Sequence, residues 1–263
     1  MALSRRGLIR GGLATAAGIA LGVTAAQVPR WLRPNRLPID GGYAPAGNAS
    51  SWSPRGGVRT IWHVPTTKPW VALTFDDGPE PDWTPRVLDT LDRLQATATF
   101  FLVGERLLRN ANLVRGRYDR HDVGNHTFTH SDLAQRDEAS VRDELRKCHE
   151  AITAVVGRRP TLLRPPWGHL GGTTLTVADE FDYDVVMWSY AMPEQRYLSD
   201  PAGIVDDVAG VVRPGSILLA HDVGNSSRLV TIDSLSGIIT ALRAKGLELV
   251  TVSQLLSAQT THS

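Results

Sequence analysis

The sequence lacks the features that define several protein classes. It contains a single cysteine, Cys148, so no internal disulfide can form and a disulfide-stabilised secreted scaffold is excluded. No internal repeat is present, and neither is the G-x-S-x-G motif of serine hydrolases. Hydrophobic residues make up 42% of the 263 residues, which is too many for a disordered chain. These observations leave one or two ordinary globular domains.

The chain also lacks an excess of one charge, with 28 Lys and Arg against 27 Asp and Glu. The charges are unevenly distributed, because seven of the basic residues but only one acidic residue, Asp40, precede Val58. The remainder therefore carries a formal charge of −5. Nucleic-acid binding depends on clustered cations that replace counterions, so no nucleic-acid partner is expected for this acidic region.

Residues 1–26 combine a basic start with an uncharged, weakly apolar stretch. Arg5 and Arg6 precede Gly7 and two apolar residues, and no charged residue occurs from 11 to 28. This pattern resembles a twin-arginine export signal, whose machinery carries folded proteins. We expect an exported protein, extracellular or in the cell envelope, with a cleaved signal. The alternative is an uncleaved membrane anchor, which would be the protein's only contact with a membrane.

Two segments flank the predicted domain. Residues 27–57 are rich in Pro, Gly, Ser and Asn and show no apolar periodicity, which is typical of a flexible linker. The domain is expected over residues 58–258, followed by a short tail at 259–263.

From Val58 onward, short apolar runs alternate with helical periodicity, as in βα units. One helix is expected to have Thr84 as its N-cap, and another to end at Gly157 with Cys148 on its buried face. About seven alternations predict a single, barrel-like α/β domain. Strands are predicted at 71–75, 97–103, 161–163, 183–188, 216–220 and 247–250, and further helices at 173–181, 201–212 and 232–244.

Polar residues follow the predicted strands, where such a barrel places its reactive groups. Asp76 and Asp77 come directly after the first strand and precede a Gly-Pro turn. Adjacent strand residues point to opposite faces, so the turn must aim the two carboxylates separately. One can bind a cation while the other accepts a proton. Taken alone, the pair is equally compatible with a solvated turn.

His126 and His130 lie four residues apart. In a helix or a tight turn they can converge on one ion, and neutral imidazole is the preferred nitrogen ligand of zinc. This spacing alone has many chance occurrences. Together with one carboxylate from Asp77, the pair would supply three protein ligands and leave a position for water, as in catalytic zinc sites.

Two further clusters carry polar groups beside apolar strands. The turn Arg164-Pro165-Pro166-Trp167 presents a guanidinium, an aromatic ring and a free backbone N–H at Trp167, although a purely structural Pro-Pro turn is an alternative. His221 ends an apolar strand. Taken alone, a histidine at such a position is more often structural than catalytic.

The four clusters, in this order, resemble the motifs of the polysaccharide deacetylase family, carbohydrate esterase family 4. These motifs are T-F-D-D-G, H-[ST]-x-x-H, R-x-P-[YW]-G and L-x-L-x-H, and the resemblance covers residues 58–256. It implies a single catalytic domain with a distorted (β/α) barrel. It also implies a divalent metal, usually zinc, with Co²⁺ or Ni²⁺ as alternatives, and the removal of acetyl groups from acetylated polysaccharides.

The resemblance further implies a role for each matching residue. Asp77, His126 and His130 would hold the metal, Asp76 would be the general base and His221 the general acid. Arg164, with Pro165 beside it, would position Asp76, and the Trp167 N–H would help to bind the oxyanion.

One family motif is altered in this chain. The fourth motif is approximately W-x-x-D-x-x-D-W, but here Trp188 is followed by Ala191 at the first acid position and Glu194 near the second. A histidine without a carboxylate partner has less reason to stay protonated near neutral pH. We hypothesise that Glu194 replaces the missing partner of His221, or that the pH profile or the substrate differs.

The expected function is removal of acetyl groups from N-acetylated sugars of a cell-envelope or extracellular polysaccharide, such as peptidoglycan or chitin. An O-acetyl esterase acting on a xylan-like glycan and a non-catalytic glycan-binding protein are the alternatives. Trp83, Trp167 and Trp188 are candidate stacking faces for sugars, although Trp188 on an apolar strand is more often a core residue.

Overall fold

The computed structural model of the protein describes residues 57–259. The predicted export signal, nearly all of the predicted linker and most of the predicted tail lie outside the described residues. Within residues 57–259, no helix is both long and apolar enough to cross a membrane.

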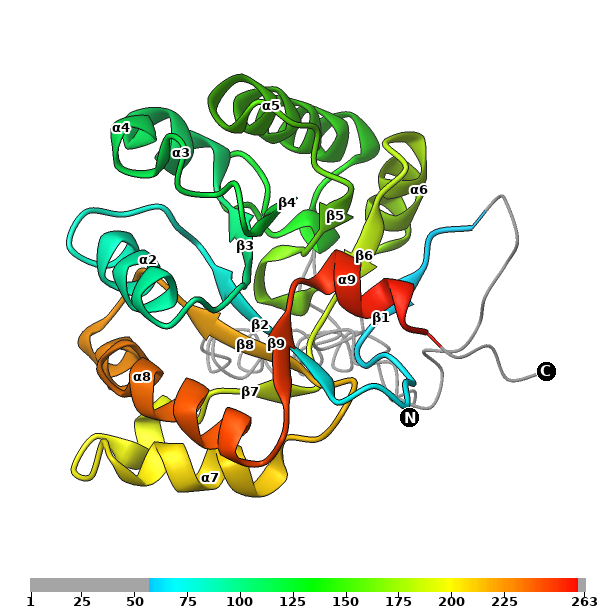
Figure 1. The fold of residues 1–263 in the computed structure, drawn as a ribbon. Helices are drawn as coiled ribbons and strands as arrows, with labels where there is room; N and C mark the ends of the chain where they lie inside the picture. The colour runs from blue at the N-terminus through cyan, green and yellow to red at the C-terminus, as the bar shows by residue number, and fades with distance from the viewer. Residues whose placement is uncertain (1–56, 260–263) are drawn as a thin grey trace, which may run out of the picture. The chain divides into compact units, whose positions relative to one another are not determined.

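A curled sheet of nine strands forms a half-barrel at the centre of the domain (Figure 1). Its order is β1-β6-β5-β4-β3-β2-β8-β7, with β9 also pairing with β2, and all strand pairs are parallel. The strands are β1 (Thr60–Ile61), β2 (Trp70–Asp76), β3 (Thr99–Leu102), β4 (Asp122–Asn125), β5 (Leu162–Leu163), β6 (Asp184–Val186), β7 (Tyr190–Ala191), β8 (Ile217–His221) and β9 (Glu248–Val250).

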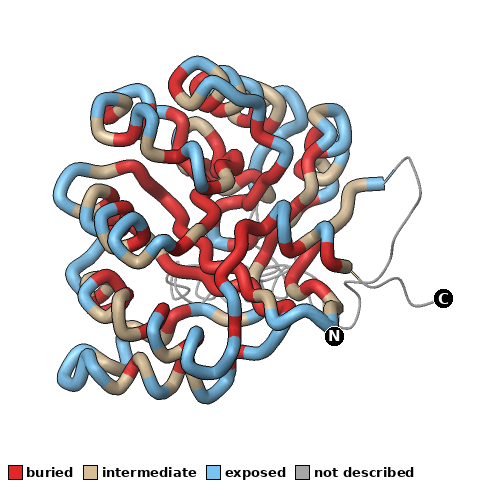
Figure 2. The backbone as a smooth tube through the Cα atoms, viewed as in Figure 1, coloured by how far each residue is buried: buried red, intermediate tan, exposed pale blue. Residues whose placement is uncertain are grey.

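Helices surround this sheet, because each parallel pair needs a crossover connection. Figure 2 shows that their outward faces are exposed while the strands are buried. The α-helices are α2 (Thr84–Arg93), α3 (Gly104–Arg109), α4 (Ala111–Val114), α5 (Glu138–Val156), α6 (Gly172–Glu180), α7 (Gly203–Val211), α8 (Leu229–Ala244) and α9 (Val252–Ser257). Short 3₁₀ turns are η3 (Leu133–Gln135), η4 (Pro166–Gly168), η5 (Glu194–Tyr197) and η6 (Ser226–Arg228).

Strand β2 divides its side chains between two cores. Val71, Leu73 and Phe75 pack in the large cluster that includes residues of α2 and α8, whereas Ala72 packs in a separate cluster with residues of β3, β5 and β8. Because successive side chains alternate, Asp76 faces the same inner side of the curled sheet as Ala72. The strand therefore delivers one carboxylate to the inside of the half-barrel at its C-terminal end.

The predicted fold class is confirmed, and the six predicted strands all occur within one or two residues of their expected ends. The sheet has nine strands instead of about seven, because β1, β4 and β7 were not predicted. Two of these contain only two residues, and β4 reads Asp-Val-Gly-Asn, which carries little apolar signal.

The ends of two helices test the local predictions. Gly157 ends α5 with φ 81°, as expected of a left-handed C-cap, and Cys148 is fully buried. Thr84 is not an N-cap, because Trp83 takes that position and the Thr84 hydroxyl is used elsewhere. That hydroxyl accepts a hydrogen bond from the Glu80 N–H and donates one to Asp222.

Candidate active site

Asp76 is held at the end of β2 by a buried arginine. Arg164 donates from Nη1 to Asp76 Oδ1 and to the Thr74 hydroxyl, at 2.7 Å each. Its remaining nitrogens donate to the backbone carbonyls of Val186 and Met187. Burial lowers the pKa of Arg164, while the carboxylate of Asp76 opposes this effect. The guanidinium binds Oδ1 of Asp76, so Oδ2 is the carboxylate oxygen that receives no hydrogen bond from Arg164.

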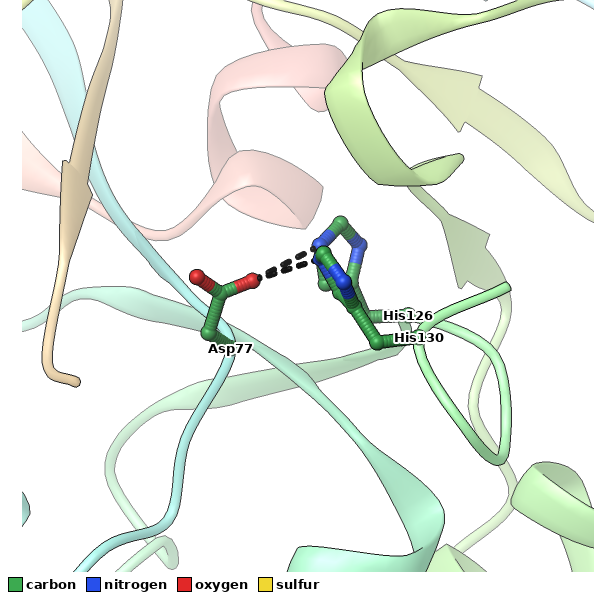
Figure 3. A group of neighbouring side chains, drawn as sticks. All are labelled: Asp77, His126 and His130. Carbon is green, nitrogen blue, oxygen red and sulfur yellow. Dashed lines mark ion pairs between the residues drawn. The ribbon is translucent and has the colours of Figure 1, made fainter. Parts of the chain in front are cut away.

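Asp77 is turned away from Asp76 by a left-handed backbone, with φ 79°. Its Oδ1 lies 2.9 Å from His130 Nε2 and 3.3 Å from His126 Nε2, and Figure 3 shows the carboxylate facing both imidazoles. Arg228 donates to its Oδ2 at 2.7 Å, and Arg106 donates to its backbone carbonyl. Burial would raise the pKa of Asp77, but hydrogen bonds with the two imidazoles hold that pKa well below its usual range.

The two histidines converge through a tight loop and not through a helix. His126 follows β4, and both Thr127 and His130 adopt left-handed backbone, with φ 68° and 61°. The His126 Nδ1 lies 2.6 Å from the Arg164 carbonyl oxygen, to which it donates. This bond leaves Nε2 as the nitrogen that faces Asp77.

The donor set fits a divalent cation. The ligand atoms of Asp77, His126 and His130 all lie within 4.8 Å of one another. One carboxylate oxygen and two imidazole nitrogens match the donors that zinc prefers, and the His126 Nδ1 bond to a carbonyl is the usual support of a ligating histidine. Burial lowers the pKa of His126, but the charges of Asp76 and Asp77 outweigh burial and raise it. A cation would compete with protons for these nitrogens.

His221 lies beside this group, because β8 pairs with β2 in a register that sets His221 opposite Asp76. Burial lowers the pKa of His221 to about 4, an effect that Asp76 opposes and Arg228 reinforces. Among the described residues, no side chain forms a hydrogen bond with its imidazole. The site therefore brings the predicted acid close to the predicted base without a partner for the acid.

The Arg164–Gly168 turn forms the wall next to His130. Trp167 is held at φ 56°, its side chain is 55% exposed, and its ring centroid lies 4.5 Å from that of His130. Within residues 57–259, its N–H has no hydrogen-bond partner. Pro165 supplies the carbonyl that accepts from Gly168 and closes the turn. Trp83 and Trp188 are partly buried against the core, so Trp167 is the exposed candidate among the three.

The structure does not bring Glu194 into hydrogen-bonding contact with His221. Glu194 Oε1 accepts from the Thr231 hydroxyl at 2.9 Å. Burial raises the pKa of Glu194, while Thr231 and Arg228 lower it. Ala191, which replaces the first acid of the fourth motif, lies on β7 opposite Leu219 of β8. Position 191, on the strand that pairs with β8, therefore carries no carboxylate that could contact His221.

Several polar residues of the site were not predicted from the sequence. Arg228 ends η6, in the segment between β8 and α8, where the general rule for barrel active sites could have pointed to it. Asp222 directly follows His221 and is fully buried, and its Oδ2 accepts from Thr84 at 2.6 Å while its Oδ1 has no partner among the described residues. Burial raises the pKa of Asp222 to about 7. Glu144, on α5, contacts the loop of the two histidines and carried no signal of its own.

Comparison with known proteins identifies the family. Residues 63–186 match the polysaccharide deacetylase family model, a segment that contains Asp76, Asp77, His126, His130 and Arg164. A peptidoglycan-N-acetylglucosamine deacetylase of Bacillus cereus is 36% identical over 198 residues, which cover 74% of this chain and 92% of that protein. A chitooligosaccharide deacetylase of a Bradyrhizobium strain is 35% identical over 199 residues, covering 70% of this chain and 90% of the relative.

A solved structure agrees with this match. The crystal structure of the Bc1960 peptidoglycan N-acetylglucosamine deacetylase superposes with a TM-score of 0.71 and 32% identity, over 77% of this chain and 95% of that chain. Similarity at this level, over nearly the whole of the relatives, extends well beyond the motifs. The chain therefore belongs to the polysaccharide deacetylase family and is a deacetylase of the hydrolase class.

Proposed function

We propose that this deacetylase removes acetyl groups from N-acetylated sugars of a peptidoglycan-like or chitin-like polysaccharide and that it depends on a divalent cation. The observation that carries the proposal is the convergence of Asp77, His126 and His130 beside Asp76, the carboxylate held by Arg164. The names of the relatives support the substrate class. Bound by these three residues, a cation such as Zn²⁺ would lower the pKa of a water and polarise the acetyl carbonyl.

Asp76 acts as the general base in this proposal. Its Oδ1 is occupied by Arg164, so Oδ2 is the oxygen that accepts a proton from the attacking water. That oxygen lies 3.8 Å from His126 Nε2, on the side of the three grouped ligand atoms. The buried guanidinium keeps the carboxylate in one orientation, so the base does not have to be oriented during the reaction.

Trp167 and His221 complete the proposed chemistry. The Trp167 N–H has no hydrogen-bond partner within residues 57–259, and the ring of this residue packs against His130, so the N–H is available to donate to the developing oxyanion. His221, opposite Asp76, donates a proton to the departing sugar amine. Its lowered pKa makes the imidazolium a minor species at neutral pH, which supports the hypothesis of an altered pH profile.

We also propose that the protein is exported and acts on a glycan outside the cytoplasm. The paired Arg5 and Arg6 before an uncharged stretch support export through the twin-arginine machinery. Replacing both arginines with lysine should leave the full-length protein in the cytoplasmic fraction. Continued export of that variant would contradict this route.

The function is tested by acetate release from N-acetylated and O-acetylated glycans. We expect release from N-acetylglucosamine polymers, its loss in a chelator, and its recovery with Zn²⁺. Asp76→Asn should bind Zn²⁺ yet lose roughly 10²- to 10⁴-fold in kcat. Release that is insensitive to chelator would overturn the metal-dependent proposal. Release from O-acetylated xylan alone would favour an esterase, and no release from any glycan would favour a binding protein.

A further inference from the structure

The loop that carries His126 and His130 is held in a conformation that L-residues rarely adopt. Thr127 and His130 both have positive φ, at 68° and 61°, and Thr127 is also β-branched. Such backbone costs free energy and persists only where surrounding contacts impose it. Contacts from outside the loop must therefore maintain the convergence of the two imidazoles.

One carboxylate on α5 supplies three of these contacts. Glu144 Oε2 accepts from the N–H groups of Phe128 and Thr129, at 2.9 and 2.8 Å. Its Oε1 accepts from the Thr129 hydroxyl at 2.7 Å. The next residue, Leu145, is buried, and its carbonyl accepts from Asn125, the residue before His126. Helix α5 thus holds the loop from both of these positions.

The other contacts of the loop do not replace Glu144. The carbonyls of Thr127 and Phe128 accept from the N–H groups of Gly104 and Glu105, and the Thr127 N–H donates to Asn125. These bonds fix the start of the loop and two of its carbonyls. Among the described residues, Glu144 is the acceptor for both N–H groups in the middle of the loop.

We propose that Glu144 is a positioning residue for the metal site, which sets the turn that brings His126 and His130 to Asp77. The inference rests on the proposed function, in which these three residues hold a cation. Glu144 does not contact the ligand atoms and acts through the backbone of Phe128 and Thr129. A methionine at this position would keep the length of the side chain but offer no strong acceptor to the N–H groups of Phe128 and Thr129, whereas a glutamine could still accept from both.

The test compares Glu144→Met with a matched change on the same helix, Glu150→Met. Glu150 is exposed and pairs with Arg146, away from the loop. Zn²⁺ binding to chelator-treated protein is measured by calorimetry, and amide hydrogen exchange is measured at Phe128 and Thr129. We expect Glu144→Met to bind Zn²⁺ 10- to 100-fold more weakly and to exchange both amides faster, and Glu150→Met to match wild type.

Thr129→Val provides a second variant, which removes the hydroxyl that donates to Glu144 at 2.7 Å and makes a longer, 3.5 Å contact with the Ser131 hydroxyl. It should weaken Zn²⁺ binding by about fivefold, even if Glu144→Met does not fold. Wild-type affinity in Glu144→Met, or in Thr129→Val where that variant alone folds, would overturn the positioning role and leave the proposed function standing. A wild-type protein that binds no Zn²⁺ would overturn the proposed function itself.

Discussion

The two sides of the site differ in how firmly the chain holds them. The metal side is the group of proposed cation ligands, Asp77, His126 and His130. There the imidazole of His126 donates a hydrogen bond to a carbonyl, Asp77 accepts one from Arg228, and the loop between the two histidines donates to Glu144. The acid side is the proposed general acid, His221, with its surroundings. Among the described residues no side chain forms a hydrogen bond with the His221 imidazole, and Ala191 stands where the family motif has an acid. The chain thus holds the three proposed cation ligands in place, while the pKa of the proposed acid, His221, depends on burial and on the charges around it.

Arg164 is the residue whose loss should disrupt the site most severely, because its side chain holds Asp76. Arg164→Met would remove the guanidinium that pairs with the buried carboxylate of Asp76. It would also remove the four hydrogen bonds that this guanidinium donates. We expect the free energy of unfolding to fall by about 3–5 kcal/mol and the activity to be lost. Urea denaturation measures the change, with Thr74→Val as the control that removes a single donor and acceptor and should cost about 1 kcal/mol. Equal losses in the two variants would contradict the central place of Arg164.

Acid should weaken the side of the site that carries His126 and His130, through the buried His121 before β4. This imidazole precedes β4, accepts from the Ala98 N–H through Nδ1, and has no partner for Nε2 among the described residues. Burial lowers its pKa from 6.5 to about 4. His121 in the unfolded chain is therefore protonated below pH 6.5, whereas in the folded chain it stays neutral until the pH falls to about 4.

The stability that His121 contributes is fully present above pH 6.5 and decreases as the pH falls toward 4. The free energy of unfolding should fall by about 3 kcal/mol over this pH range. Denaturation curves at several pH values, all in chelator, measure it against His121→Gln, which keeps an acceptor but does not titrate. Parallel pH dependences in the two proteins would show that His121 is not the cause.

On the acid side, His221→Gln should remove proton donation without disturbing the cation. We expect kcat to fall by about 10²-fold, at the low end for a general acid, because a lowered pKa leaves little imidazolium at neutral pH. Calorimetry should show wild-type Zn²⁺ affinity. A parallel loss of Zn²⁺ affinity would mean that the two sides are not separable.

The contrast between the two sides also explains what could be predicted from the sequence. Asp76, Asp77, His126 and His130 lie in short motifs at strand ends, and the resemblance of these motifs to a known family predicted that they lie together. Arg228 and Glu144 act through bonds between segments distant in the sequence, 151 residues apart for Arg228 and Asp77, and no local pattern encodes such a pairing. Strands β1 and β7, of two residues each, were missed for the same reason, since their pairing arises from the tertiary fold and not from periodicity.

Glu194→Gln should have the smallest effect, and it decides whether the acid side has a hidden carboxylate partner. The charges that act on the pKa of His221 come from Asp76, Arg228, Asp77 and His126, and Glu194 is bonded to Thr231. Glutamine keeps an oxygen that can accept from Thr231, so kcat/KM should stay within about twofold of wild type and the pH–rate profiles should coincide.

The direction of any shift in that profile identifies its cause. A general acid must be protonated, so activity declines as the pH rises through the pKa of His221. If Glu194 supported the imidazolium, its neutralisation would lower that pKa and move the alkaline limb to lower pH. Ala191→Asp serves as the positive control, because a carboxylate on the strand beside β8 should move the same limb to higher pH. A response to Ala191→Asp but not to Glu194→Gln would place the tuning position at 191 and leave Glu194 as a structural partner of Thr231.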